Sequence, residues 1–244
     1  MNEIKVSKKV KRIFIQKRDV EVFKLCLEMK FSDIESINEI VFRNRDLNMF
    51  VARKRVQKLE ATGYLKSIIL QPGSLKKYYV STKLAYLEVI KIDQESNTPR
   101  AIKKLSQVTF EHDLCVLKSR IWLENQGRAF SWISERLLKT QLASQTGTIT
   151  RYFLPDGLFT SKNGKICAFE YENKPKSEQQ LREKIIQLNS IMSKNDPIFE
   201  LCLFIASTES LKTKIQKITQ MYPSKFLVQS VSEIQTQEPK NEHK

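Results

Sequence analysis

The chain has 244 residues, a length that suggests two domains, and its 42 Lys and Arg against 27 Asp and Glu give a net charge of +15, which favours a polyanionic partner such as nucleic acid. Its four cysteines form neither a CxxC motif nor a Cys/His cluster, which argues against structural zinc and against a disulfide framework. No apolar stretch approaches the roughly 18 to 20 residues that cross a bilayer, so we expect a cytoplasmic protein without a membrane partner.

The N-terminal part of the sequence predicts three helices in succession. Apolar residues at helical spacing place the first helix over 19–29. A second helix begins after Asp33, a typical capping residue, and ends near Arg43. The third helix runs from 47 to 62, and the glycine that follows it is suited to the left-handed conformation that ends helices.

A β-hairpin follows these helices, with strands over 64–70 and 76–80 and a turn over 71–74. Three helices and a hairpin describe a winged helix, and residues 52–65 resemble the recognition helix and first wing strand of many bacterial winged-helix regulators. We therefore predict a winged-helix DNA-binding domain over 1–92, with its third helix in the major groove. A solvated basic helix face is the alternative. The residues predicted to contact double-stranded DNA are Val51, Arg53, Lys54, Arg55, Lys58, Lys76 and Lys77.

The remainder of the chain predicts a second domain. A helix over 82–90 leads into a polar linker at 93–104, followed by the second domain over 105–232 and a disordered tail over 233–244. The second domain reads as helix, three strands, helix, strand, helix and strand, an order typical of a mixed sheet with helices on both faces. Its helices are predicted over 106–125, 177–193 and 209–221, and its strands over 129–133, 150–159, 165–172, 199–206 and 226–231.

Acidic residues gather on two neighbouring strands of this predicted sheet. Side chains alternate along a strand, so Glu170, Glu172 and Lys174 leave the same face. Such carboxylates suit Mg²⁺ or Mn²⁺, which polarises a scissile phosphate and acidifies a water, while a lysine stabilises negative charge. Asp156 joins them only if the hairpin loop has an odd length or a strand has a bulge, for which Gly157 is a candidate. Otherwise Asp156 lies in a plain turn and the other acids form a solvated strand face.

The Pro-Asp pair at 155–156, the hairpin and Glu-x-Glu-x-Lys at 170–174 resemble the PD-(D/E)xK signature of restriction-endonuclease-like nucleases. With the preceding winged helix, the segments Glu-His-Asp-Leu at 111–114 and Trp-Ile-Ser-Glu-Arg at 132–136 resemble the replication-relaxation family and the MobC-type relaxases of mobilisable plasmids. The resemblance spans nearly the whole chain. It implies an α/β (α+β) protein in which a winged helix-turn-helix precedes a restriction-endonuclease-like mixed sheet flanked by helices.

The resemblance also implies roles for particular residues. Asp156 and Glu170 would be metal ligands, and Glu135 would add a third acid from the helix after the first strand. The third signature position would be Glu172 or Lys174. His112, on a helix, would orient a water or a phosphate, although a histidine on a helix surface is more often inert.

We therefore expect a site-specific, metal-dependent DNA endonuclease or nicking relaxase that acts on plasmid or mobile-element DNA at an origin of transfer or replication. A monomer suffices for nicking, whereas a double-strand cut needs a homodimer or a partner from a transposition or mobilisation nucleoprotein complex. The chain lacks the histidine cluster of conventional relaxases and a Gly-rich phosphate loop. The alternative is a non-catalytic DNA-binding regulator of plasmid replication or transcription with a degenerate nuclease domain.

Overall fold

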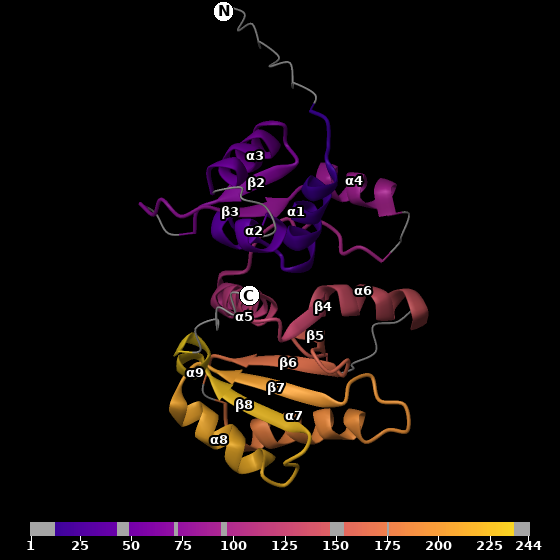
Figure 1. Cartoon of the computed structure of the whole chain (residues 1–244), viewed down its shortest axis with the longest axis vertical. Coiled ribbons are helices and arrows are strands. Elements are labelled where there is room, and N and C mark those ends of the chain that lie inside the picture. Colours follow the sequence, from indigo (N-terminus) through magenta and orange to yellow (C-terminus); the bar gives the residue numbers. More distant parts are fainter. Residues whose placement is uncertain are drawn as a thin grey trace, which may run out of the picture. The chain divides into compact units, whose positions relative to one another are not determined.

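The computed structural model describes residues 13–42, 49–70, 73–93, 97–146, 154–174 and 176–236. The chain divides into two compact units, 1–104 and 105–244, and each contains helices and a sheet (Figure 1). The predicted mixed α/β class is therefore confirmed. The parts of the predictions that fall on 43–48, 71–72, 150–153 and 237–244 lie outside the described residues.

The helices of the first unit follow the predicted order. They are α1 (Lys17–Glu28), α2 (Ile34–Val41), α3 (Met49–Ala61) and α4 (Lys83–Asp93). The Asp33 carboxylate caps α2 by accepting a hydrogen bond of 2.9 Å from the Ser36 N–H. Gly63, at φ +82°, ends α3 and lets the next N–H reach back to the Leu59 carbonyl at 3.0 Å.

The sheet of the first unit has three antiparallel strands in the order β1-β3-β2. The hairpin strands β2 (Leu65–Ile68) and β3 (Tyr78–Ser81) are shorter than predicted at the loop side. The sequence analysis missed β1 (Ser32–Asp33), because two residues before a helix cap carry no alternating pattern. The Ser81 hydroxyl donates to the Phe23 carbonyl at 3.0 Å, which ties β3 to α1.

The second unit contains a five-stranded mixed sheet in the order β4-β5-β6-β7-β8. The strands are β4 (Ala129–Ser134), β5 (Gly157–Ser161), β6 (Ile166–Glu172), β7 (Leu201–Ala206) and β8 (Phe226–Ser230). β4, β5 and β6 pair antiparallel, whereas β6, β7 and β8 pair parallel. The parallel strands are joined by helical crossovers, as parallel pairing requires.

The described residues of this unit form helices α5 (Gln107–Asn125), α6 (Glu135–Thr146), α7 (Glu178–Met192), α8 (Glu209–Thr219) and α9 (Val231–Thr236). The order read from the sequence pattern omitted α6, although the resemblance implied a helix carrying Glu135 after the first strand. Among the described side chains of α6, Leu138 is the one that joins the buried core with residues of α7 and α8, so the apolar pattern of this helix is weak. The helix α9 extends into the stretch predicted as a tail from 233 onwards. The strand predicted over 150–159 begins later, at 157, after a proline that cannot donate to a sheet ladder.

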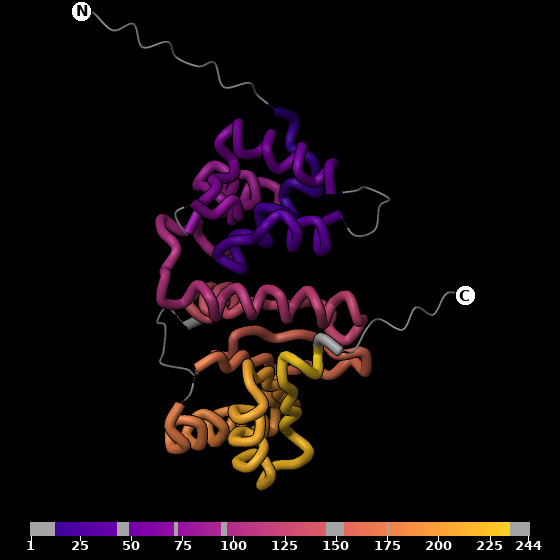
Figure 2. The backbone as a smooth tube through the Cα atoms, turned by 90° about the vertical axis from the view of Figure 1, so that its left-hand side faces the viewer, coloured from indigo at the N-terminus to yellow at the C-terminus, as the bar shows by residue number. Residues whose placement is uncertain are grey.

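The sheet of the second unit is covered by helices on both faces (Figure 1). α5 runs along one side of the sheet (Figure 2), where the His112 ring contacts the Tyr171 ring. α7 and α8 cover the other side, where Leu181 and Ile215 pack with Ala168 of β6. Alternate residues of β6 therefore face different helices, and the even-numbered ones face α7.

Candidate functional site

The β5–β6 hairpin has a three-residue loop, which decides the position of Asp156. The Ser161 N–H donates to the Lys165 carbonyl at 2.8 Å, so only 162–164 form the loop. Gly157 then pairs with Phe169, and the register brings Asp156 opposite Glu170. The odd loop length that the sequence analysis left open is therefore the one observed, and both acids lie at the same end of neighbouring strands.

The sheet also contains a bulge, but it lies on β4 between Phe130 and Ile133, with Ser131 at φ +49°. The sequence analysis had considered Gly157 as the bulge site. Gly157 instead allows close packing, because a Cβ atom there would come within 2.6 Å of the Trp132 ring. The glycine thus lets β5 approach β4 directly beside Asp156.

Glu170 and Glu172 share one lysine that comes from α7. Lys184 Nζ lies 2.6 Å from Glu170 Oε2 and also forms an ion pair with Glu172 Oε1. Both glutamates are almost completely buried, with 1% and 2% of their surfaces exposed. The exposed Lys174 lies beyond the end of β6, while Lys176 forms a second ion pair with Glu172 at 2.8 Å. Lys184 and Lys176 are therefore the lysines that form ion pairs with these glutamates, and the sequence analysis named neither of them.

Asp156 is held by a histidine and a backbone amide. Its Oδ2 atom lies 3.2 Å from His112 Nε2 and accepts a hydrogen bond of 2.9 Å from the Tyr171 N–H. The same histidine nitrogen lies 3.1 Å from the Tyr171 carbonyl oxygen. We refer to Asp156, Glu170 and Glu172 with their partners His112 and Lys184 as the acidic cluster. The Nε2 atom of His112, from α5, contacts two oxygen atoms at the end of the β5–β6 pair.

The charges of this cluster shift the pKa values of its members. Burial lowers the pKa of His112, but hydrogen bonds to Asp113 and Asp156 outweigh this effect and raise the pKa from 6.5 to about 10. Burial raises the pKa of Asp156, but the bond to His112 and the charge of Lys184 bring it below its usual value. Burial raises the pKa of Glu170 to about 8, against the opposing charge of Lys184. Burial lowers the pKa of Lys184, but Glu170 and Glu172 more than compensate and raise it.

These shifts predict that the second unit loses stability as the pH rises. His112 binds its proton more tightly when folded, so its contribution is complete below pH 6.5 and is lost as the pH rises through about 10. The raised pKa of Glu170 acts in the same direction between pH 4.5 and about 8. We expect His112→Gln to reduce the fall in the free energy of unfolding between pH 6.5 and 10, as measured by urea denaturation. Equal slopes for the variant and the wild type would contradict this assignment.

Glu135 is near this cluster through its backbone. Its N–H donates to the Asp156 carbonyl at 3.2 Å, which joins the start of α6 to the residue before β5. The Glu135 carboxylate, however, forms an ion pair with Lys139 of α6 at 2.5 Å and is one-third exposed. The backbones of the three predicted metal ligands therefore lie close together. The Glu135 carboxylate, however, pairs with Lys139, whereas Asp156 contacts His112 and Glu170 contacts Lys184.

The donor atoms fit a divalent cation in type but not in present arrangement. Within the described residues, no three His, Cys, Asp or Glu side chains converge on one point as an ion site requires. Glu170 Oε1 nevertheless is buried without a hydrogen-bond partner among the described residues, although a buried carboxylate oxygen normally has one. Asp156 and Glu170 would hold Mg²⁺ or Mn²⁺, because carboxylate oxygens are the ligands that these hard cations prefer.

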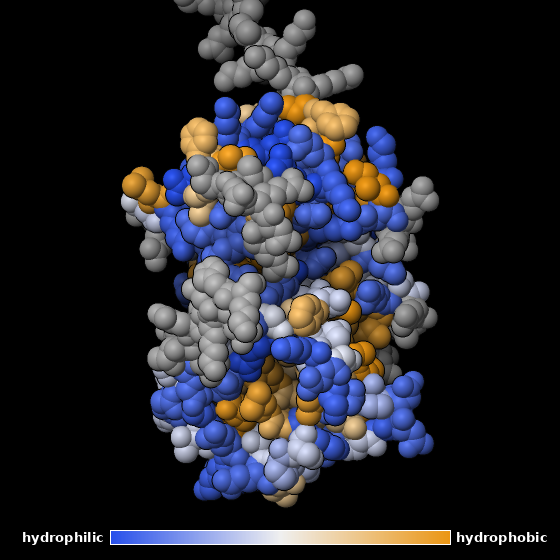
Figure 3. Space-filling model, viewed as in Figure 1, coloured by the Kyte–Doolittle hydropathy of each residue, from blue (hydrophilic) through white to orange (hydrophobic). Residues whose placement is uncertain are grey.

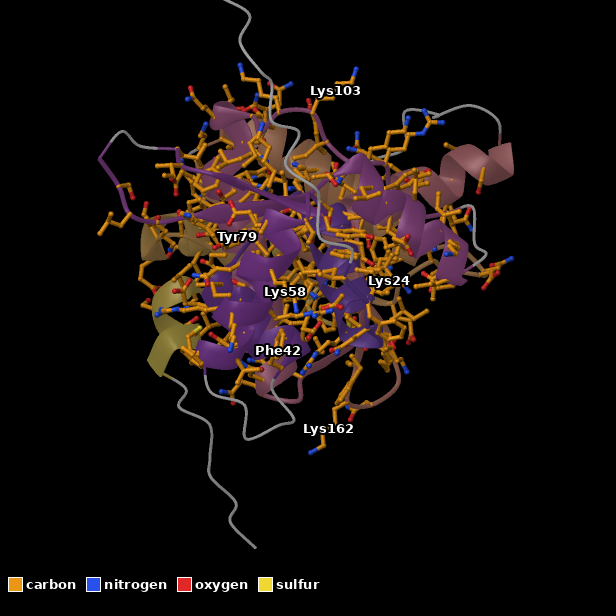
Figure 4. All side chains as sticks on the ribbon, turned by 90° about the horizontal axis from the view of Figure 1, so that it is seen from above. Lys24, Phe42, Lys58, Tyr79, Lys103 and Lys162 are labelled. Atoms are coloured by element: carbon orange, nitrogen blue, oxygen red, sulfur yellow. The ribbon has the colours of Figure 1, made fainter. Side chains whose placement is uncertain are left out.

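The first unit carries a second candidate site on α3 and the β2–β3 hairpin. Arg53, Lys54 and Lys58 are exposed on α3, which buries Ala52, Val56 and Leu59 on its other side. The hairpin adds two exposed lysines, Lys76 and Lys77, and Lys76 Nζ lies 3.5 Å from an Asp33 oxygen. The face of this unit that is visible in Figure 3 is mostly hydrophilic. Lys58 of α3 and Tyr79 of β3 are labelled in Figure 4, which views the molecule from above.

A hollow of about 270 Å³ lies between these elements in the first unit. The residues that line it include Arg53 and Gln57 of α3, Lys76 and Lys77 of the hairpin, and Glu35 of α2. Three of these side chains are cationic and one is acidic. The hollow is therefore a basic recess in which an anionic group such as a phosphate would be attracted.

Arg55 does not belong to this exposed surface. Its Nε atom donates to Asp19 Oδ1 at 2.8 Å, and its terminal nitrogen donates to the Phe14 carbonyl at 2.8 Å and forms an ion pair with Asp19 Oδ2. Asp19 is completely buried in α1. Val51 is half-buried at the start of α3. Arg55 therefore links α3 to α1, in contrast to the DNA contact predicted for it.

Comparisons with known proteins returned no match to a family, to a characterised protein or to a solved structure. None of the helices in the described part of the chain combines the length and apolarity that crossing a bilayer requires.

Proposed function

We propose that the chain is a DNA-binding, metal-dependent phosphodiesterase that nicks or cuts DNA. The observation that carries this proposal is the register of the β5–β6 hairpin, because it puts Asp156 opposite Glu170, whose Oε1 atom is buried without a hydrogen-bond partner among the described residues. Two acids at the same end of neighbouring strands, with a lysine beside Glu170, are groups that suit metal-dependent phosphodiester hydrolysis.

Each unit has an element order that supports this proposal. The first unit has helices α1 to α3 followed by the β2–β3 hairpin, with β1 on the free side of β3, which agrees with a winged helix. The second unit has a mixed sheet in which an antiparallel hairpin carries the acids and a crossover helix supplies the lysine. This order agrees with the restriction-endonuclease-like fold that the sequence resembles.

The residues of the second unit would divide the chemistry between them. Asp156 and Glu170 would bind a divalent cation, which supplies Lewis acidity and a water of lowered pKa. His112 orients the Asp156 carboxylate from the α5 side of the sheet. Lys184 would neutralise negative charge on the scissile phosphate, since its ammonium group lies beside both glutamates.

The first unit would supply DNA affinity through α3 and the hairpin. We expect Lys54→Ala combined with Lys58→Ala to lower affinity for duplex DNA and to reduce the slope of log affinity against log salt by about 2. The measurement is fluorescence anisotropy over a salt series. The matched control is Lys83→Ala with Lys91→Ala, two exposed lysines of α4. An equal change in both double variants would mean that total charge, and not α3, determines binding.

A non-catalytic DNA-binding regulator is the second candidate function. It is favoured by the ion pairs of Lys184, which occupy the glutamates, and by the pairing of Glu135 with Lys139. In that case the acidic cluster would stabilise the second unit and perform no chemistry.

The test of the proposed function is cleavage of supercoiled plasmid DNA carrying an origin of transfer or replication. The wild-type chain is incubated with Mg²⁺, with Mn²⁺, or with EDTA, and the products are separated on a gel. Metal-dependent open circles would support a nicking enzyme, and linear DNA would support paired active sites. DNA binding without either product, with both metals, would favour the regulator.

A further inference from the structure

Lys184 occupies the space between the two carboxylates of β6. Its ammonium group lies 2.6 Å from Glu170 Oε2 and bonds Glu172 Oε1 as well, and only 12% of its side chain is exposed. A Mg²⁺ ion bound to Glu170 would lie about 2.0 to 2.1 Å from a carboxylate oxygen. An ammonium group and a divalent ion so close together would repel each other strongly in this buried setting.

His112 has a comparable position on the other acid. Its Nε2 atom contacts both Asp156 Oδ2 and the Tyr171 carbonyl oxygen. Asp156 Oδ2, the Tyr171 carbonyl oxygen and Glu170 Oε2 are thus each in contact with a cationic or hydrogen-bonding side chain. Glu170 Oε1, by contrast, is buried without a hydrogen-bond partner among the described residues.

Glu172 differs from Glu170 in the number of its partners. It forms ion pairs with both Lys184 and Lys176, whereas Lys184 is the cation paired with Glu170. If Lys184 moves away from Glu170, it still has Glu172 as a partner, and Glu172 still has Lys176. Displacement from Glu170 would therefore leave the Lys184 ammonium group paired with Glu172.

We propose that Lys184 acts as an internal cation that closes the site, and that a divalent metal ion binds by displacing it from Glu170. This inference rests on the proposed function. It adds that Lys184 blocks the metal site when no metal is bound. Once a metal ion has displaced it, the lysine is available to contact a DNA phosphate. Lys184 is in this respect a positioning residue whose location depends on whether the ion is bound.

The first test is Mn²⁺ binding to the full chain, followed by electron paramagnetic resonance in the absence of DNA. We expect Lys184→Met to bind Mn²⁺ at least about tenfold more tightly than the wild type, because the competing charge is absent. Adding Glu170→Gln to this variant should remove the gain. Lys194→Met, at an exposed lysine after α7, is the matched control and should bind as the wild type does.

A second measurement uses the wild-type chain and does not depend on the folding of a variant. Reductive methylation of lysines, read by peptide mass spectrometry, should modify Lys184 slowly without metal and faster with Mn²⁺, while Lys194 reacts equally in both. Equal Mn²⁺ affinity of the wild type and Lys184→Met, or a Lys184 that stays protected with Mn²⁺ bound, would overturn the displacement. Metal-dependent nicking would then still support the proposed function. Absence of Mn²⁺ binding in every variant would overturn the displacement as well, and absence of nicking would separately overturn the function.

Discussion

Asp156→Asn is expected to lower metal-dependent nicking of plasmid DNA by at least about a hundredfold. Asparagine has nearly the same volume as aspartate and retains an oxygen that accepts the hydrogen bond from the Tyr171 N–H. It removes the negative charge that would hold a divalent cation opposite Glu170. The rate is measured as the appearance of open circles with Mn²⁺, at a protein concentration that saturates the DNA.

The matched control for this experiment is Asp196→Asn, which makes the same chemical change at an exposed residue after α7. It should nick at the wild-type rate. The thermal unfolding of Asp156→Asn must also be measured, because the variant removes the charge that His112 faces. A well-folded Asp156→Asn protein with undiminished nicking would place the reaction elsewhere in the chain.

Arg55→Ala is expected to destabilise the first unit by about 3 kcal/mol, roughly a hundredfold change in its folding equilibrium. The substitution leaves the buried Asp19 carboxylate without its guanidinium partner and also removes the hydrogen bond to the Phe14 carbonyl. Asp19 would keep the bond from the Gln16 N–H at 2.7 Å. One backbone bond does not offset the cost of a buried charge.

The measurement must separate the two units, because unfolding of a two-unit chain is not a single transition. Both tryptophans, Trp122 and Trp132, lie in the second unit. Their fluorescence should follow urea unfolding of that unit and remain unchanged by Arg55→Ala. Hydrogen exchange of peptides from α1 and α3 reports the first unit, and we expect their protection to fall.

Arg53→Ala is the control two positions away on the same helix. Arg53 is exposed beside the basic recess, so its loss should change stability by less than about 0.5 kcal/mol while weakening DNA binding. The two arginines should therefore give opposite phenotypes. Unchanged protection in Arg55→Ala, together with weaker DNA binding, would restore the contact that the sequence analysis predicted.

Sequence patterns predicted most of the elements, because each long helix and strand has its own periodicity. They did not determine whether Asp156 faces Glu170. Asn163-Gly164 is typical of a two-residue turn, yet the loop has three residues, and loop parity alone changes the face of every residue before it. The register is a property of the hairpin's hydrogen bonds and not of the acids that it aligns.

The sequence analysis did not predict the ion pairs of Arg55 and Lys184, and the two positions share a feature. Arg55 lies three residues after Ala52 and four before Leu59, and Lys184 stands in the same relation to Leu181 and Leu188. Each is therefore inside the buried stripe of its helix. A cation in such a stripe needs an anion on a neighbouring element, and this signal is present in the sequence. The sequence does not show which anion this is, because the partner depends on how the helix packs.

We expect the β5–β6 hairpin and the crossover helix α7 to form at different stages of folding. A three-residue loop joins β5 to β6, so their pairing involves little loss of chain entropy, and we expect it to form early. Lys184 arrives only when α7 packs on the sheet. Until then Glu170 and Glu172 remain hydrated, because burying them without the lysine is unfavourable. We therefore expect the docking of α7 to exclude water from this end of the sheet. A folding intermediate in which α7 has not docked would expose the carboxylates of Glu170 and Glu172 to solvent.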